Sequence, residues 1–374
     1  MGDEEKKSRP LAIIIDDSVH SELHEQTKEL QLVIEKLDTK NLNFLRERKI
    51  ETLRFMIRND ALLDLSPLTQ MPALTSIIFE ANSIKEKTLE VLARCGSLRN
   101  LRIDTKQSSS LDLSGLNTSN IKSLVVWAYN MDGGTLPENE SIEELTCILG
   151  KTTWIDLSPL KMCKNILTLG LGFSQAFDAI ALEPLSSCNK LFHFALTGTG
   201  IEEVDLTPLK PLNKLGKLVL MDNKLKDVDL AAFRNNKAFE QLYLTGNQLR
   251  ELDLTPLAGT SLQELWLDNN NLERIDLKHL PKTIKKLILT KNKLKQINLE
   301  PLRDSAIEIL NLRLNEIEQI DIDPLLDCRH LREVHLGGNR IRSAVRNINK
   351  LATKYVHEYP YHVEVSGDPE IFPD

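Results

Sequence analysis

The chain has 374 residues, a net charge of −7 and an isoelectric point near 5.7, which excludes a chain-wide attraction for nucleic acid. The longest apolar run near the N-terminus, LAIII at 11–15, is far shorter than the roughly 18 residues of a membrane helix and is followed by two aspartates. Aromatic residues make up 5 % of the chain, which suits a core built mainly from leucine and isoleucine. We therefore expect a cytoplasmic protein with neither a membrane nor a nucleic-acid partner.

The first 49 residues are expected to form an N-terminal cap. LAIIID from Leu11 and KELQLVIEKL from Lys28 are typical of strands, or of a strand followed by a helix. Leu30 lies 23 residues before Leu53, so residues 27–37 are a candidate for a degenerate first repeat. HSELH at 20–24 lacks the adjacent His-Glu of a zinc-protease motif and is interpreted as a solvated or capping segment.

From Ile50 onward the pattern L-x-x-L-x-L-x-x-N-x-L occurs thirteen times over residues 50–342, at intervals of 21 to 25 residues. The clearest copies are consecutive, as in LGKLVLMDNKL from Leu215 and FEQLYLTGNQL from Phe239. The thirteen copies start at Ile50, Leu74, Leu98, Ile121, Ile142, Ile166, Leu191, Leu215, Phe239, Leu262, Ile284, Ile307 and Leu331.

This consensus and period resemble the leucine-rich-repeat family, whose units are 20 to 29 residues long. The resemblance implies an α/β fold, a solenoid in the form of a curved right-handed horseshoe. Its concave side would be a parallel sheet, and its convex side would consist of short 3₁₀ or helical turns. Proteins of this family present the concave sheet to protein partners, so the resemblance also implies an interaction protein.

Within one repeat, the alternation in L-x-x-L-x-L predicts a strand, with Leu218 and Leu220 facing the core and Val219 and Met221 facing outward. The asparagine at the ninth position is expected in a turn, where its amide can bond backbone groups of its own and adjacent repeats. Asn82 is an early member of this column, and six consecutive repeats carry the others: Asn223, Asn247, Asn270, Asn292, Asn315 and Asn339.

The second half of many repeats reads D-L-S/T-P-L, as in 253–257. Here we expect the Ser or Thr hydroxyl to cap a short helical turn that has Pro at its first position. The aspartates should accept backbone N–H groups of the adjoining turn, and a cation-binding ladder is the alternative. They are Asp64, Asp112, Asp156, Asp205, Asp229, Asp253, Asp276 and Asp321.

The stretch 98–200 departs from the consensus, because its ninth positions hold Lys106, Tyr129, Gly150, Ser174 and Thr199. Sequence drift under weak constraint and a local bend or loop that serves a partner are both compatible with this. The glycines of GLG at 170–172 and TGTG at 197–200 are interpreted as turn residues of the repeats, because a phosphate-binding loop would need a lysine and a following helix.

The five cysteines are expected to be small core residues, because an odd number without a C-x-x-C pair argues against a zinc site or a disulfide framework. Cys163 and Cys188 lie in neighbouring repeats, so a disulfide between them stays open. The last segment, 343–374, is predicted to be a helical cap over 343–355 followed by an acidic tail.

The fifth position of each repeat projects from the centre of the concave sheet and is the predicted binding surface. Four successive residues there are large and apolar or aromatic, although folding does not require it: Val219, Tyr243, Trp266 and Ile288. Such a stripe is typical of a binding hot spot. Met221, Asp268, Arg313 and His335 complete the predicted partner-binding set. Terminal segments or neighbouring polar side chains that cover the stripe are the alternative.

A lysine-rich repeat follows this stripe and is expected to be mostly solvated, with an acidic partner as the other interpretation. Only Lys286 and Lys291 should reach the concave side. The cluster comprises Lys278, His279, Lys282, Lys285, Lys286, Lys291, Lys293 and Lys295.

No set of nucleophile, base and orienting residue stands out from the repeat pattern, so we predict neither an enzyme nor a cofactor or metal site. The predicted function is a protein-protein interaction scaffold or adaptor, and a monomer is favoured. A regulatory subunit that controls a phosphatase or a small GTPase is the alternative. Tyr243→Asp or Trp266→Asp is expected to abolish binding at a stability cost below about 0.5 kcal/mol.

Overall fold

The computed structural model describes residues 11–15, 28–34, 42–46, 48–57, 64–84, 86–105, 111–131, 134–173, 179–341 and 364–366. The chain divides into two compact units, Met1–Ser174 and Gln175–Asp374, at a boundary that the sequence analysis does not anticipate. The predicted C-terminal helix at 343–355, the acidic tail and the segment 20–24 lie outside the described residues.

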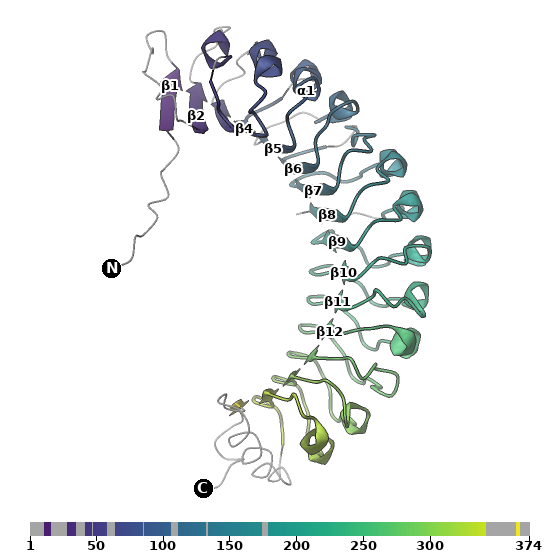
Figure 1. Ribbon diagram of the computed structural model, residues 1–374. Helices are drawn as coiled ribbons and strands as arrows, with labels where there is room; N and C mark the ends of the chain where they lie inside the picture. The colour runs from purple at the N-terminus through teal and green to yellow at the C-terminus, as the bar shows by residue number, and fades with distance from the viewer. Residues whose placement is uncertain are drawn as a thin grey trace, which may run out of the picture. The chain divides into compact units, whose positions relative to one another are not determined.

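The described residues of the first unit form eight parallel strands that pair in chain order (Figure 1). Leu30 pairs with Leu53, so a strand precedes the first full repeat in register with it. The strands are β1 (Leu11–Ile15), β2 (Glu29–Ile34), β3 (Thr52–Ile57), β4 (Ser76–Ala81), β5 (Asn100–Thr105), β6 (Ser123–Ala128), β7 (Glu144–Leu149) and β8 (Thr168–Phe173).

In the part of the second unit that the structure describes, eight parallel strands also follow in chain order, and most of them are shorter. They are β9 (His193–Thr197), β10 (Lys217–Val219), β11 (Gln241–Tyr243), β12 (Glu264–Trp266), β13 (Lys286–Ile288), β14 (Ile309–Asn311), β15 (Glu333–His335) and β16 (Glu364–Ser366). Each of the thirteen predicted repeats therefore has its strand, from β3 to β15, which confirms the predicted solenoid with a parallel sheet.

Short helices line the outer side of each unit, opposite the strands (Figure 1). In the first unit they are η1 (Leu42–Leu45), η2 (Ser66–Gln70), α1 (Glu86–Ala93), η3 (Ser114–Leu116) and η4 (Ser158–Met162). In the second unit they are η5 (Glu183–Ser187), η6 (Thr207–Leu209), η7 (Ala231–Phe233), η8 (Thr255–Gly259), η9 (Glu300–Leu302) and η10 (Asp323–Asp327). All are 3₁₀ helices except α1, as predicted for the convex side.

The 3₁₀ turns of the D-L-S/T-P-L motif begin at the Ser or Thr and have Pro as their second residue, so the predicted Ser or Thr cap with Pro at the first position is wrong. The N-cap residues of η4 and η8 are Leu157 and Leu254, whose side chains have no oxygen to accept a hydrogen bond. Instead the aspartate of the motif accepts the N–H two residues later: Ser158 N donates to Asp156 at 2.8 Å and Thr255 N to Asp253 at 2.9 Å. The aspartate two residues before the start of the turn is therefore the acceptor for the N–H of the first turn residue.

Every aspartate of the predicted column accepts such a bond, which confirms the backbone-bonding interpretation. Asn298, at the same phase, accepts the N–H of Glu300 at 3.0 Å, so the role needs an oxygen and no charge. No group of three or more His, Cys, Asp or Glu side chains that could hold a metal ion occurs among the described residues.

The core of each unit lies between strands and outer turns and consists mainly of leucine and isoleucine. Phenylalanines stack within it, Phe55 on Phe79 at 4.7 Å and Phe233 on Phe239 at 4.3 Å between ring centroids. All five cysteines are buried and free, which confirms their core role and leaves no Cys163–Cys188 disulfide. Within the described part of the chain, every helix is too short or too polar to cross a lipid bilayer.

The predicted asparagine ladder occupies the turns after strands β10 to β15 of the second unit. Asn270, for example, donates to the Leu244 carbonyl of the preceding repeat at 2.9 Å and to the Leu267 carbonyl of its own repeat at 3.1 Å. Its amide oxygen accepts the N–H of Leu249 at 3.1 Å. One buried side chain therefore joins two successive repeats at the edge of the sheet.

Candidate functional site

The predicted apolar stripe exists as a continuous column, but only its centre is accessible. Val219 pairs with Tyr243, Tyr243 with Trp266 and Trp266 with Ile288 across neighbouring strands. Val219 and Ile288 are only 8 % and 7 % exposed, so the expectation of four exposed residues is wrong for these two. Each is a short side chain beside a large ring, and the ring covers it.

Tyr243 and Trp266 form a rigid aromatic pair in the middle of the column. Their rings stack at 5.6 Å between centroids with 23° between the planes. The Tyr243 hydroxyl donates to Glu264 Oε2 at 2.8 Å, and Trp266 Nε1 donates to the same oxygen at 3.2 Å. Both rings are half-buried, so the carboxylate fixes their orientation while part of each stays accessible. We call Tyr243, Glu264 and Trp266 the aromatic platform.

Two lysines flank the aromatic platform. Lys217 Nζ lies 4.9 Å from the Tyr243 ring centroid, and Lys286 Nζ lies 3.2 Å from Glu264 Oε1. Burial together with the hydrogen bond to the Glu264 carboxylate raises the pKa of Tyr243, so its hydroxyl remains a donor at physiological pH. Partial burial acts to raise the pKa of Glu264, but hydrogen bonds from Tyr243, Lys286 and Trp266 outweigh it and lower the pKa.

The remaining predicted residues lie around this platform. Met221 is half-buried after β10, and Asp268 accepts a hydrogen bond from Thr245 Oγ1 at 2.7 Å. His335 Nε2 lies 2.9 Å from Glu333 Oε2, and Arg313 is exposed beyond β14. The structure therefore brings Val219, Tyr243, Trp266, Ile288 and His335 into one column and places the other three at its edge.

An apolar patch in the first unit was not predicted from the sequence. Its residues occupy the seventh position of the repeat, whereas the predicted stripe occupies the fifth. Trp127 and Ile148 pair across β6 and β7, are 46 % and 41 % exposed, and lie beside Tyr129. Arg102 lies 4.9 Å from the Trp127 ring centroid. The next residue of this column, Gly172, lies within β8, so the prediction that Gly170 and Gly172 are turn glycines is wrong. The sequence signal for this patch was the occurrence of Trp127 and Ile148 at outward-facing positions of successive repeats.

A second missed feature is the turn that directly follows the strands of the second unit. The eighth residue of each repeat there has a left-handed backbone, with φ between 54° and 74°. Among these residues Leu314 is 46 % exposed. The seven residues are Gly198, Asp222, Gly246, Asn269, Lys291, Leu314 and Gly338.

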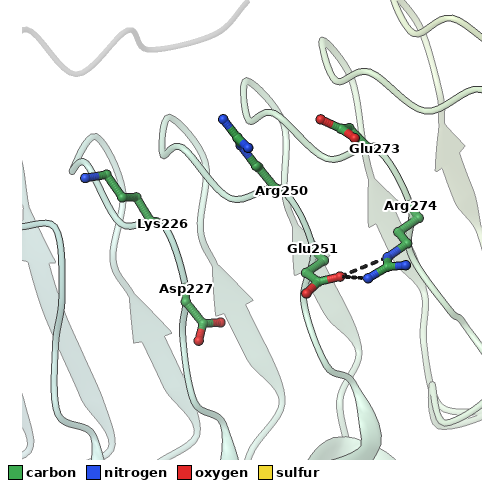
Figure 2. A pocket seen from close by; sticks show the side chains of 6 residues that line it. All are labelled: Lys226, Asp227, Arg250, Glu251, Glu273 and Arg274. Atoms are coloured by element: carbon green, nitrogen blue, oxygen red, sulfur yellow. Dashed lines mark hydrogen bonds and ion pairs between the residues drawn. The ribbon is translucent and has the colours of Figure 1, made fainter.

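A polar hollow of about 630 Å³ lies on the flank of the second unit (Figure 2). Arg274 Nε donates to Glu251 Oε2 at 2.8 Å within it. Its six lining residues are exposed, three basic and three acidic, which differs from the largely apolar lining of small-molecule sites. They are Lys226, Asp227, Arg250, Glu251, Glu273 and Arg274. We therefore place the candidate site on the sheet.

Comparison with known proteins agrees with this architecture. The family model described as leucine rich repeat matches residues 213–272. A search of curated proteins found no match.

Solved structures with the same fold come from bacteria and insects. An internalin from Listeria monocytogenes is 21 % identical, with 84 % of this chain and 89 % of that chain covered and a TM-score of 0.58. An LRR protein from Leptospira interrogans is 18 % identical, with 92 % and 90 % covered and a TM-score of 0.62. Drosophila Toll, in its complex with Spatzle, is 15 % identical with a TM-score of 0.58. The match includes 87 % of the present chain and 44 % of the Toll chain.

At these identities the similarity establishes the fold, and the repeat motif over 213–272 agrees with it. The chain has the leucine-rich-repeat fold, and its residues 213–272 match the model of that repeat.

Proposed function

We propose that this chain is a non-enzymatic interaction protein of the cytoplasm that binds a protein partner through the aromatic platform of its second unit. The observation that carries the proposal is the stacked Tyr243–Trp266 pair, held on the outward face of the sheet by Glu264. The five free, buried cysteines are compatible with a reducing compartment.

The aromatic platform has the chemistry of a binding hot spot. Trp and Tyr are enriched among residues that dominate binding energy, and they contribute most when water is excluded around them. Their orientation here is set before binding by the stack and by two hydrogen bonds to one carboxylate. A preorganised pair loses little side-chain entropy when a partner arrives, so more of the contact energy appears as affinity.

The folding of the repeat gives no separate reason for these rings. The core-facing leucines of the same strands, Leu242 and Leu265, are completely buried on the opposite face of the sheet. Toll, one structural neighbour, was solved in a complex with Spatzle. We extend partner binding by this fold to the present chain as part of the proposal.

The test compares three purified forms of the full chain in affinity capture with quantitative mass spectrometry. They are the wild type, Tyr243→Ala/Trp266→Ala, and Arg250→Ala, which alters the flank hollow. The partner should be retained by the wild type and by Arg250→Ala. Its affinity for the double variant should fall at least about 100-fold, as for loss of a hot-spot pair.

Alanine is preferred to the aspartate substitutions considered above, because an aspartate at 243 or 266 would repel the Glu264 carboxylate. The stability cost is also revised: loss of the stack and its hydrogen bonds should cost about 1–2 kcal/mol. Circular dichroism must show that the variants are folded. Unchanged capture by the folded double variant, or loss with Arg250→Ala alone, would contradict the proposal.

A further inference from the structure

Two adjacent turns of the second unit hold residues that do not suit their backbone. The left-handed region is accessible to glycine at no cost and to asparagine or aspartate at little cost, but it strains other residues. Five of the seven eighth-position residues are Gly, Asn or Asp, and the exceptions are Lys291 and Leu314, with φ of 54° and 55°. Strain of this kind persists where function requires a particular side chain.

The side chain at 314 contributes little to the core. Leu314 is 46 % exposed, whereas Leu312, two residues earlier, is completely buried. One side of Leu314 lies over Gly338, since a Cβ at 338 would come within 2.5 Å of Leu314 Cδ2. An apolar side chain is therefore held outward on strained backbone.

The same two turns carry two cations, Lys291 and Arg313, that have no ion pair within the described residues. Lys291 N donates to the Arg313 carbonyl at 2.9 Å, which places these two residues in contact between successive repeats. Both side chains are exposed, and no acidic group of the described residues forms an ion pair with either of them. Some neighbouring cations are paired, as Lys286 is with Glu264 and Arg340 with Glu316, so these two acidic side chains already have partners.

This feature is continuous with the aromatic platform. Trp266 pairs with Ile288, Ile288 pairs with Asn311, and Arg313 follows Asn311 by two residues. Strands β12 and β14 are two strands apart, or about 10 Å. About three residues of extended chain would cover that distance.

We propose that the partner segment that binds this unit is acidic and carries an apolar side chain beside its acidic residues, and that Lys291, Arg313 and Leu314 recognise these two features. We call these three residues the basic edge. The inference rests on the proposed function, because the aromatic platform would bind the adjoining part of the same segment. The carboxylates would neutralise Lys291 and Arg313, and the apolar group would cover Leu314.

A random twelve-residue peptide library displayed on phage tests this inference on the full chain. The wild type should enrich peptides in which Asp or Glu lies within a few residues of Leu, Ile, Met or Phe. Lys291→Glu/Arg313→Glu should instead enrich Lys or Arg beside the apolar residue. Leu314→Gly should keep the acidic preference and lose the apolar one.

Lys278→Glu/Lys285→Glu is the matched control, since it changes the net charge equally at two exposed lysines away from the basic edge. A synthetic peptide from the wild-type selection should bind this control as it binds the wild type. It should bind Lys291→Glu/Arg313→Glu at least 10-fold more weakly, and added salt should reduce that difference.

The inference is overturned if the wild type enriches no acidic peptides, or if the charge-reversed variant enriches the same peptides as the wild type. The proposed function fails separately, in the capture experiment with Tyr243→Ala/Trp266→Ala. A captured partner whose binding depends on the aromatic platform but is unaffected by Lys291→Glu/Arg313→Glu would refute this inference and leave that function intact.

Discussion

Side-chain choice at single turn residues follows backbone conformation in most repeats of the second unit. Gly198, Gly246 and Gly338 have φ between 65° and 74°, where a Cβ is unfavourable. At Gly338 the missing side chain also leaves room for Leu314. Where the turn holds leucine instead, conformational preference no longer explains the residue.

We predict that Leu314→Gly leaves the free energy of unfolding unchanged or raises it by up to about 1 kcal/mol. Relief of left-handed strain should equal or exceed the greater backbone entropy that glycine has in the unfolded chain. Leu312→Ala, which removes a buried side chain from the same repeat, should instead cost about 2–5 kcal/mol. Urea denaturation measures both, and a loss above about 1 kcal/mol for Leu314→Gly would show that Leu314 supports the fold.

Acid should weaken the outer turns through their aspartates. Hydrogen bonds from the hydroxyl and the N–H of Ser158, Thr207 and Thr255 lower the pKa of Asp156, Asp205 and Asp253, in that order, from the ordinary value of 3.8. Because the folded-state pKa is the lower one, these bonds stabilise the fold above pH 3.8. That contribution is lost as the pH falls through the lowered values.

Asp156→Asn/Asp205→Asn/Asp253→Asn should therefore show a smaller decrease in melting temperature between pH 5 and pH 2.5 than the wild type. Asparagine can still accept the backbone N–H, as Asn298 does, but it does not titrate. Thermal melts followed by circular dichroism at a series of pH values provide the measurement. Parallel pH profiles for the two proteins would show that these carboxylates do not contribute to acid sensitivity.

At the scale of the strand, the six consecutive ninth-position asparagines all follow short strands, although β4, which Asn82 follows, has six residues. Strands β3 to β8 are six residues long, whereas β10 to β15 are three residues long. In the second unit Asn247 Nδ2 donates to the Leu220 carbonyl at 2.8 Å, so a side chain takes an acceptor that a regular ladder would offer to backbone. Repeats with Tyr129 or Gly150 at this position have no such donor, and their strands continue further.

Asn270→Ala should destabilise the fold by roughly 1–3 kcal/mol, because the buried Leu249 N–H would lose its acceptor and the Leu244 carbonyl would lose one of its two donors. Asn271→Ala is the control at the next residue, where the side chain is only half-buried, and it should change stability by less than about 0.5 kcal/mol. Chemical denaturation compares the two variants. Equal effects would mean that the asparagine ladder does not join the repeats.

At the scale of the whole chain, the reactivity of the buried cysteines measures how readily individual repeats open. Cys95, Cys147 and Cys163 belong to the first unit, and Cys188 and Cys328 to the second. Burial raises the pKa of Cys95 to about 11 and that of Cys147 to about 12, so almost no reactive thiolate is present at neutral pH.

We predict that a thiol reagent such as 5,5′-dithiobis(2-nitrobenzoate) modifies none of the five cysteines rapidly at pH 7.5 without denaturant. In denaturing urea all five should react at the rate of a free thiol. Peptide mapping during slow labelling would rank the cysteine-containing repeats by the rate at which each one opens. Rapid modification of the native protein would contradict the buried placement, and a mass change on reduction would contradict the free thiols.

The repeat period, the core leucines, the asparagine ladder and the parallel strands were all predictable from sequence, because each is a local pattern repeated at a fixed interval. One repeat needs only its neighbours to bury its apolar face, so periodicity alone specifies the architecture. The D-L-S/T-P-L motif predicted the 3₁₀ turns in the same way. The hydroxyl cap predicted from the same motif was wrong, whereas the predicted bonds between the aspartates and the backbone of the turn are present.

Accessibility was decided only by tertiary structure. Val219 and Ile288 occupy the same outward position as Tyr243 and Trp266, but side chains from adjacent strands lie about 4.8 Å apart, and the larger rings cover the smaller neighbours. The strain at Leu314 likewise depends on its backbone angles. Whether Lys291 and Arg313 find an acidic partner within the described residues depends on side chains of neighbouring repeats, some twenty residues away. A linear pattern indicates which face a side chain occupies, whereas packing between repeats determines whether a partner can reach it.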